Sequence, residues 1–286
     1  MECLFQGVAT ALITPFRDGK IDYDSLSRLI ARQTAAGIPA LAVCGTTGEG
    51  SVLSYREAAR VIRHTRKEFP GVLIAGCGAN CTDRAVDLAE RAADAGADAL
   101  LAVTPYYNKA NRAGLIAHYR ALCRVGRPVI VYHVPSRTGL RLTVDDFAAL
   151  AELPGICGFK EASGDLSLLH ALTAVPGSPP VWVGNDDSIR AAALLGARGV
   201  ISVVSNLLPA EAIRLWEAGT LRDSDASAEL HRSLSERVAS LGWEVNPIPV
   251  KYVASRMGLC SCEYRLPLAP PSPSVARRLD AVWGGN

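Results

Sequence analysis

The segment Gly155-Ile-Cys-Gly-Phe-Lys160-Glu-Ala-Ser-Gly164 decides how the rest of the chain is interpreted. Its first half is a short apolar run that predicts a buried strand, and its second half turns through small residues toward a helix. The strand ends on Lys160. An ammonium group in an apolar wall is costly unless it is paired or loses its proton, and a neutral lysine is a nucleophile toward carbonyl groups. The plain alternative is a lysine whose flexible stem reaches from the strand end into solvent.

The same order of apolar run, turn and helical segment recurs along the chain. Seven further apolar runs cover residues 8–14, 40–44, 72–76, 97–104, 128–132, 181–186 and 199–204. Because these runs are continuously apolar rather than alternating, they predict parallel strands that are covered on both faces. Eight such units predict an α/β fold, the (β/α)8 TIM barrel. An open doubly wound sheet is the competing fold, but no glycine-rich dinucleotide fingerprint follows the first strand.

Capping residues mark the helices between these strands. Helix starts are predicted at Asp22 or Asp24, at Ser54 in the capping box Ser54-Tyr-Arg-Glu57, at Thr82 and at Thr143. Glycines predict the helix ends, at Gly37, Gly96, Gly196 and Gly219. Further helices are expected up to Leu241, from Pro247 to Met257 and from Pro273 to Val282. We therefore expect a barrel over residues 1–220 and a C-terminal helical extension over residues 221–286, packed on the barrel.

Composition narrows the classes of function. The 286 residues carry a formal net charge of only +2, and no basic stripe with interleaved aromatic residues favours nucleic acid. No apolar run reaches membrane-spanning length, and Met1-Glu-Cys-Leu-Phe-Gln6 does not resemble a signal peptide. The eight cysteines form no CxxC pair and no zinc-site spacing, so we expect reduced thiols in a cytoplasmic protein. The close pair Cys260 and Cys262 receives no role.

Polar residues gather where the predicted strands end. In a TIM barrel the loops at the carboxyl ends of the strands build the active site. The strand ends carry Thr46 and Thr47, Asn80, Tyr106 and Tyr107, Tyr132 with Arg137 shortly after it, Lys160, and Gly184-Asn185-Asp186. An imine-forming lysine needs hydroxyl groups that relay protons and backbone N–H groups that hold a carboxylate. An arginine suits a second carboxylate. Taken singly, the tyrosines could be core aromatics, Arg137 a solvated charge and His133 a structural residue.

Five segments carry a resemblance to a known family. They are Gly45-Thr-Thr-Gly-Glu49, Thr104-Pro-Tyr-Tyr-Asn108, Tyr132-His-Val-Pro-Ser-Arg-Thr-Gly139, Gly158-Phe-Lys-Glu-Ala-Ser-Gly164 and Asn246-Pro-Ile-Pro-Val-Lys251. These segments resemble the dihydrodipicolinate synthases, a branch of the pyruvate-dependent class I aldolases that also include N-acetylneuraminate lyase. The resemblance covers essentially the whole chain. It implies condensation of pyruvate with aspartate semialdehyde in lysine and diaminopimelate biosynthesis, by a cytoplasmic homotetramer (a dimer of dimers) that needs no metal or organic cofactor.

The resemblance also implies a role for each site residue. Lys160 forms the imine with pyruvate, and Thr47 with its neighbouring backbone holds the pyruvate carboxylate. Thr46, Tyr132 and Tyr107 form a proton relay, in which Tyr107 reaches the site of a neighbouring subunit. Arg137 receives the carboxylate of aspartate semialdehyde. The backbone groups of Gly184 and Ile201 line the pocket near the imine.

The chain departs from the family pattern at several positions. His133 replaces an asparagine and Gly50 a serine. Where feedback-inhibited members bind lysine, the chain has Tyr55, Ala58 and Arg84, although Asn80 and Tyr106 remain. Because an arginine cannot accept a hydrogen bond from an ammonium group, we predict weak or absent inhibition by lysine. Two alternatives stay open: a family enzyme that acts on a sugar acid, and a non-catalytic member that binds a keto acid.

Overall fold

The structure, a computed structural model, describes residues 3–284 and contains a closed barrel of eight parallel strands. In order around the barrel the strands are β1, β10, β9, β8, β7, β6, β5 and β4, which confirms the predicted TIM barrel. Their bounds are Gly7–Ala11 (β1), Ala40–Val43 (β4), Val72–Gly76 (β5), Ala99–Val103 (β6), Val129–His133 (β7), Ile156–Glu161 (β8), Val181–Val183 (β9) and Gly199–Ser202 (β10). A small antiparallel hairpin of β2 (Phe16–Arg17) and β3 (Lys20–Ile21) follows the first strand.

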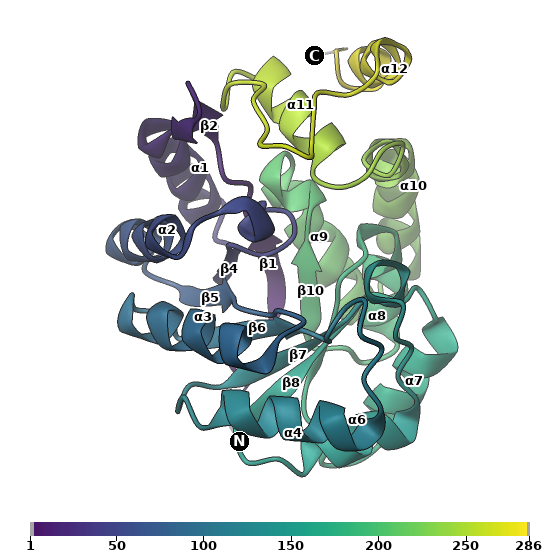
Figure 1. Cartoon of the computed structure of the whole chain (residues 1–286). Coiled ribbons are helices and arrows are strands. Elements are labelled where there is room, and N and C mark those ends of the chain that lie inside the picture. Colours follow the sequence, from purple (N-terminus) through teal and green to yellow (C-terminus); the bar gives the residue numbers. More distant parts are fainter. Residues whose placement is uncertain (1–2, 285–286) are drawn as a thin grey trace.

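Helices surround the barrel on its outside (Figure 1). They are α1 (Tyr23–Ala35), α2 (Tyr55–Glu68), α3 (Thr82–Asp94), α4 (Arg112–Cys123), α6 (Val144–Ala151), α7 (Leu166–Ala174), α8 (Ile189–Leu194) and α9 (Pro209–Thr220). The short elements α5 (Pro135–Thr138), η1 (Gly50–Val52), η2 (Asp186–Ser188) and η3 (Val204–Asn206) follow the ends of β7, β4, β9 and β10. These short turns carry the polar side chains of the strand ends into the loops above the barrel.

Side-chain caps begin several of the helices at the predicted residues. Asp22 accepts the N–H of Ser25, and complete capping boxes join Ser54 with Glu57 and Thr143 with Asp146. Each cap satisfies N–H groups that a helix start leaves without a partner inside the helix.

Two predicted helix boundaries are wrong. Thr82 is the first residue of α3 rather than its cap, since its hydroxyl faces His118 Nδ1 at 3.0 Å. Helix α9 does not stop at Gly219 but continues to Thr220. A Cβ at Gly219 would lie 2.7 Å from the Cβ of Ala193, so this glycine permits close packing of α9 on α8 rather than ending a helix.

Three strands end two or more residues earlier than the apolar runs predicted. β1 stops at Ala11, β9 at Val183 and β10 at Ser202. Beyond β10, the N–H groups of Val203 and Val204 donate to the carboxylate of Asp186, at 3.0 and 2.7 Å. A side chain therefore replaces the strand ladder at this point and turns the chain above the barrel.

Two apolar layers make up the core. The inner layer fills the barrel and includes Ile74, Ile130, Trp182 and Ile201, and a larger outer layer lies between strands and helices. Phe5 stacks on Trp182 with ring centres 4.9 Å apart. Because the barrel interior is filled with side chains, ligands are confined to the loops at the strand ends.

The chain beyond α9 is helical, as expected. It forms α10 (Ser224–Ser240), α11 (Ile248–Arg256) and α12 (Pro273–Trp283) (Figure 1). Helix α10 contacts α8, α9 and η2, and α11 contacts η3. The division at residues 220 and 221 into two domains stays a prediction. None of the helices within residues 3–284 has the length and apolar character needed to span a bilayer.

Candidate active site

Lys160 lies at the end of β8 with 6% of its surface exposed. Its Nζ is 4.4 Å from the centre of the Tyr132 ring, and no acidic side chain of the described residues forms a salt bridge with it. Burial lowers the pKa of Lys160 to about 8, while the Asp186 carboxylate acts to raise this pKa and the Arg137 charge to lower it. About a tenth of the amine is therefore neutral, and nucleophilic, at pH 7, far more than for an unperturbed lysine.

Gly184 makes room for this lysine. A Cβ at residue 184 would lie 2.7 Å from Lys160 Cε, so a larger residue would push the lysine aside. The Gly184 N–H donates to the main-chain oxygen of Glu161 at 2.7 Å, which ties β9 to β8 beside the lysine. Ile201 also lies close in the fold, but it is fully buried in the inner core rather than at a cavity wall.

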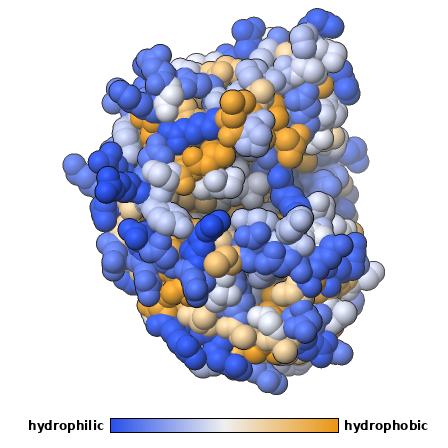
Figure 2. All heavy atoms as spheres, in the orientation of Figure 1, coloured by the Kyte–Doolittle hydropathy of each residue, from blue (hydrophilic) through white to orange (hydrophobic). Residues whose placement is uncertain are grey.

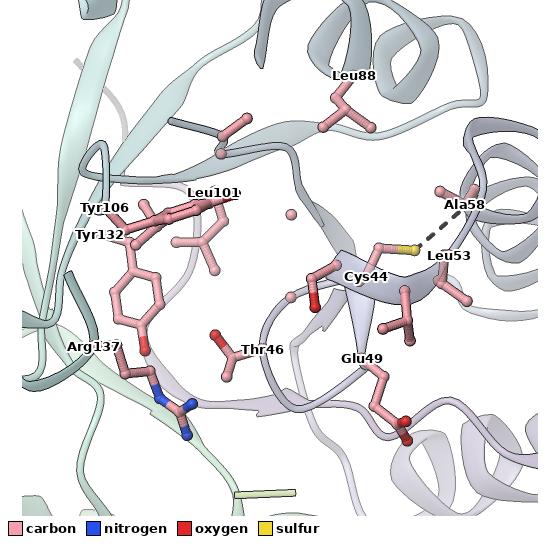
Figure 3. A pocket seen from close by; sticks show the side chains of 18 of the residues that line it. Cys44, Thr46, Glu49, Leu53, Ala58, Leu88, Leu101, Tyr106, Tyr132 and Arg137 are labelled. Atoms are coloured by element: carbon pink, nitrogen blue, oxygen red, sulfur yellow. Dashed lines mark hydrogen bonds between the residues drawn. The ribbon is translucent and has the colours of Figure 1, made fainter. Parts of the chain in front are cut away.

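Tyr132 and Thr46 face each other across the cavity (Figure 3). Tyr132 is the last residue but one of β7, the strand beside β8, and pairs with Lys160 in the sheet register. Burial raises the pKa of Tyr132, whereas the Arg137 charge and the Thr46 hydroxyl act to lower it. The structure therefore places the Tyr132 ring beside the buried amine and the Thr46 hydroxyl opposite Tyr132.

The turn Gly45-Thr-Thr-Gly-Glu-Gly50 is held in a strained shape. Glu49 has a φ of 51°, in the left-handed region that favours glycine. A Cβ at Gly50 would lie 1.9 Å from the main-chain oxygen of Cys44, so the glycine found here allows the close approach of two chain segments. The Thr14 hydroxyl donates to Gly48 O at 2.7 Å, and the Asn246 amide donates to Thr47 Oγ1 at 3.0 Å. The turn is thus tied to β1 and to the C-terminal extension.

Arg137 belongs to the one-turn helix α5, where only a loop was expected. It is an exposed residue, and its guanidinium points toward Thr46 and Tyr132 in the cavity (Figure 3). One Nη2–H donates to the main-chain oxygen of Asn246 at 3.0 Å, which leaves further N–H groups for a ligand. The short helix thus presents one arginine at the mouth of the site.

Tyr107 points away from the site of its own chain. Its surface is 87% exposed, its φ is 69°, and it lines neither of the two cavities at the barrel end. The neighbouring Tyr106 does line a cavity. An 87% exposed tyrosine on left-handed backbone can act only on something outside this chain.

Two cavities of about 560 and 570 Å³ meet at Tyr132, Val134, Arg137 and Asn246. The first extends over Cys44, Leu53, Ala58 and Leu88 (Figure 3), and the second lies between Gly184 and helix α10. Figure 2 shows this face of the molecule hollowed near its centre, with hydrophobic side chains along one edge. Tyr55, Ala58 and Arg84 all line the first cavity, as the departures from the family pattern suggested.

Two polar pairs lie behind the site. His133 is fully buried, as a structural residue should be, with Nδ1 2.9 Å from Glu161 Oε1 and Nε2 accepting the Leu142 N–H at 3.1 Å. Lys251 of α11 is also fully buried and forms an ion pair with Glu49 of the threonine turn. Neither pair was predicted. Each joins residues that are distant in sequence, and no local pattern shows that these side chains are buried.

Asp186 and Asn246 were also underestimated from sequence. In the sequence, Asp186 stands out only as part of a strand end, and Asn246 only as the start of a family segment. A buried carboxylate near Lys160 and an amide between Thr47 and Arg137 are visible only in three dimensions. Within residues 3–284 no three His, Cys, Asp or Glu side chains are grouped to hold a metal ion, and all eight cysteines are free thiols.

The comparisons with known proteins agree with this geometry. Residues 4–282 match the model of the dihydrodipicolinate synthetase family. The 4-hydroxy-tetrahydrodipicolinate synthase of Pelobacter propionicus is 41% identical over 283 residues, which cover 98% of each chain. The chloride-inhibited dihydrodipicolinate synthase of Acinetobacter baumannii, solved with pyruvate, has a TM-score of 0.93 at 37% identity and covers 98% of this chain and 99% of its own.

A third relative is a solved structure with a bound amino acid. The dihydrodipicolinate synthase of Cyanidioschyzon merolae, solved with lysine bound, has a TM-score of 0.93 at 31% identity, and 99% of each chain is covered. Two observations lead to the same conclusion. The barrel has a buried, unpaired lysine at the end of its sixth strand, and the family model matches almost the whole chain. The chain belongs to the dihydrodipicolinate synthetase family.

Proposed function

We propose that the chain is a 4-hydroxy-tetrahydrodipicolinate synthase, a lyase that condenses pyruvate with L-aspartate 4-semialdehyde through an imine on Lys160. The observation that carries the proposal is Lys160 itself, a buried amine with a pKa of about 8, without an ion-pair partner and beside the Tyr132 ring. The names of the relatives support the choice of reaction.

The first step forms the imine. The neutral Nζ of Lys160 attacks the keto carbon of pyruvate, and the resulting carbinolamine loses water after a proton reaches its hydroxyl group. The centre of the Tyr132 ring lies 4.4 Å from Lys160 Nζ and Thr46 faces Tyr132, so we assign these two hydroxyl groups to the proton relay (Figure 3). Thr47 and the N–H groups of its turn hold the pyruvate carboxylate. Gly184 contributes main-chain groups around the imine, whereas Ile201, expected to do the same, lies in the inner core and receives no part in this step.

The second step forms the carbon–carbon bond. Loss of a methyl proton converts the imine to an enamine, whose terminal carbon attacks the aldehyde of the second substrate. Arg137 binds the carboxylate of that substrate through its free N–H groups. The substrate amino group then attacks the imine carbon, closes the ring and displaces the Lys160 amine, so the enzyme returns to its starting state without any bound cofactor.

The relay needs a second copy of the chain. Since Tyr107 is 87% exposed and turned from its own site, we propose that it completes the relay of a neighbouring subunit in a homotetramer built as a dimer of dimers. The family resemblance favours such an assembly and a cytoplasmic location.

Turnover decides between this synthase and a sugar-acid aldolase of the same family. The enzyme should consume pyruvate with aspartate semialdehyde and not with N-acetylmannosamine, because Arg137 provides a charge for a second carboxylate that the sugar lacks. Turnover with N-acetylmannosamine alone would assign the chain to the aldolase. Failure with both aldehydes and no adduct on Lys160 would leave the non-catalytic keto-acid-binding role.

A further inference from the structure

Two buried acceptor atoms beside the site have no hydrogen-bond donor. Within the described part of the chain, five buried side-chain N or O atoms lack a partner, and of these only Asp186 Oδ1 and Asn246 Oδ1 belong to residues that line the cavity beside Gly184. A buried acceptor without a donor is unfavourable, and a ligand that supplies the donor removes this cost. The site therefore has places ready for a donor that pyruvate, which has no N–H group, does not supply.

Asn246 stands between the expected places of the two substrates. Its Nδ2 donates to Thr47 Oγ1 at 3.0 Å, and its main-chain oxygen accepts from Arg137 Nη2 at 3.0 Å. It is also one of the few residues that line both cavities. One side of this residue thus contacts the threonine expected to hold pyruvate, and the other contacts the arginine expected to hold the aldehyde substrate.

The contact with Thr47 fixes which end of the amide faces the ligand. A threonine hydroxyl has one hydrogen, which it must give to a carboxylate that it binds. The partner of Thr47 Oγ1 on the other side must then be a donor, which is Asn246 Nδ2. The acceptor Oδ1 is therefore left for a different group, and bound pyruvate holds the amide in this orientation.

The adjacent arginine identifies that group. In an α-amino acid the carboxylate and the ammonium share one carbon, so a carboxylate on Arg137 brings the ammonium beside the residue that Arg137 contacts. Resting on the function proposed above, we propose that Asn246 Oδ1 accepts a hydrogen bond from the ammonium of aspartate semialdehyde and so selects an aldehyde that carries an α-amino group. The same contact presents the amine that later closes the ring.

Asp186 suits this role less well. Its Oδ2 already accepts two main-chain N–H groups, from Val203 and Val204, and its charge acts on Lys160. Neither contact places it beside Arg137, where the shared carbon of the substrate is expected.

The test compares aspartate semialdehyde with succinate semialdehyde, which has the same carboxylate and aldehyde but no amino group. For wild type and Asn246→Ala we would measure kcat/KM for aspartate semialdehyde and the inhibition constant of succinate semialdehyde. The variant should lose about tenfold or more in kcat/KM for aspartate semialdehyde, while the inhibition constant changes little. Equal losses for both aldehydes would overturn the proposal, because only a general disturbance of the site affects them alike.

Asn246→Asp is the matched variant. It keeps an acceptor oxygen but has no donor for Thr47, so the preference for the amino aldehyde should persist while KM for pyruvate rises in both variants. Loss of the preference in Asp186→Asn but not in Asn246→Ala would assign the ammonium to Asp186 and contradict the proposal. The proposed function would instead be refuted if the wild-type protein formed the pyruvate adduct but never consumed aspartate semialdehyde.

Discussion

The chain buries two lysines, and their surroundings differ in one respect. Lys251 is fully buried, its Nζ lies 4.3 Å from the centre of the Phe16 ring, and it pairs with the buried Glu49. Lys160 is 6% exposed and lies over the Tyr132 ring in the same manner, but it has no carboxylate in contact. Burial lowers the pKa of both amines, and at Lys251 the Glu49 charge and hydrogen bond oppose that shift.

The comparison shows that the partner, rather than burial, decides what a buried lysine does. Lys251 keeps a charged partner and fastens α11 to the threonine turn. Lys160 lies beside Tyr132 and Gly184, which line a cavity, and the acid that acts on its charge, Asp186, uses one oxygen for two main-chain N–H groups. An unpaired amine is free to lose its proton and react, whereas a paired amine is not.

Removal of Lys160 should have the largest effect. Lys160→Met leaves no nucleophile, so we expect turnover to fall by about 10⁴-fold or more, with no pyruvate adduct and a fold that still unfolds cooperatively. Lys67→Met, at an exposed position of α2, is the matched control and should behave as wild type in a pyruvate-consumption assay. Substantial activity in Lys160→Met would remove Lys160 from the mechanism.

Removal of Lys251 should act on stability instead. Lys251→Met leaves Glu49 buried without its partner, which should lower the free energy of unfolding by about 3–5 kcal/mol in urea titrations. The double variant Lys251→Met/Glu49→Gln should recover much of this loss, because it leaves no unpaired charge. If the single variant were as stable as wild type, the ion pair could not be what holds the turn.

The pH dependence separates the two lysines by kinetics. Since the pKa of Lys160 is lowered to about 8, the reactive neutral amine becomes more abundant as pH rises from 6 to 8 and then levels off. The rate of imine formation with pyruvate should therefore rise about tenfold per pH unit below pH 8. This rate would be measured by quenching the reaction with borohydride at a series of times. A plateau only above pH 10 would show that burial does not activate Lys160.

A change at Asp186 should produce a smaller shift. The Asp186 carboxylate acts to raise the pKa of Lys160, so Asp186→Asn should lower that pKa further and make imine formation faster at pH 6 to 7. The kinetic profile of the variant should move toward lower pH, whereas the profile of Glu49→Gln should stay in place. A shift of Asp186→Asn toward higher pH would contradict the assigned charge effect.

Free lysine should have almost no effect. A carboxylate is the strongest partner for the ammonium of a bound lysine, but among the described residues that line the first cavity the acidic one is Glu49, which is already paired with Lys251. Arg84 on the same wall repels the ammonium. Activity should therefore stay unchanged at several millimolar lysine, and inhibition at millimolar or lower concentration would show another partner in the cavity.

Much of the barrel and part of the site could be predicted from the sequence. Apolar runs repeat with their own helices, so each unit is visible locally, and Lys160, Tyr132 and Thr46 follow from their places at strand ends. The pair of Lys251 and Glu49 joins residues 202 positions apart, and no local pattern connects them. The extent of α9 past Gly219 depends on packing against α8, which the sequence of α9 alone does not reveal. The features that could not be predicted from the sequence therefore arise from tertiary contacts rather than from local propensity.

The most direct test of the account is to trap the imine and locate it. The protein would be incubated with pyruvate, reduced with borohydride, digested and analysed by mass spectrometry. The account predicts one reduced pyruvate adduct, on the peptide that contains Lys160, and an unmodified Lys251. An adduct on Lys251, or none on Lys160, would contradict the claim that the unpaired buried lysine is the reactive one.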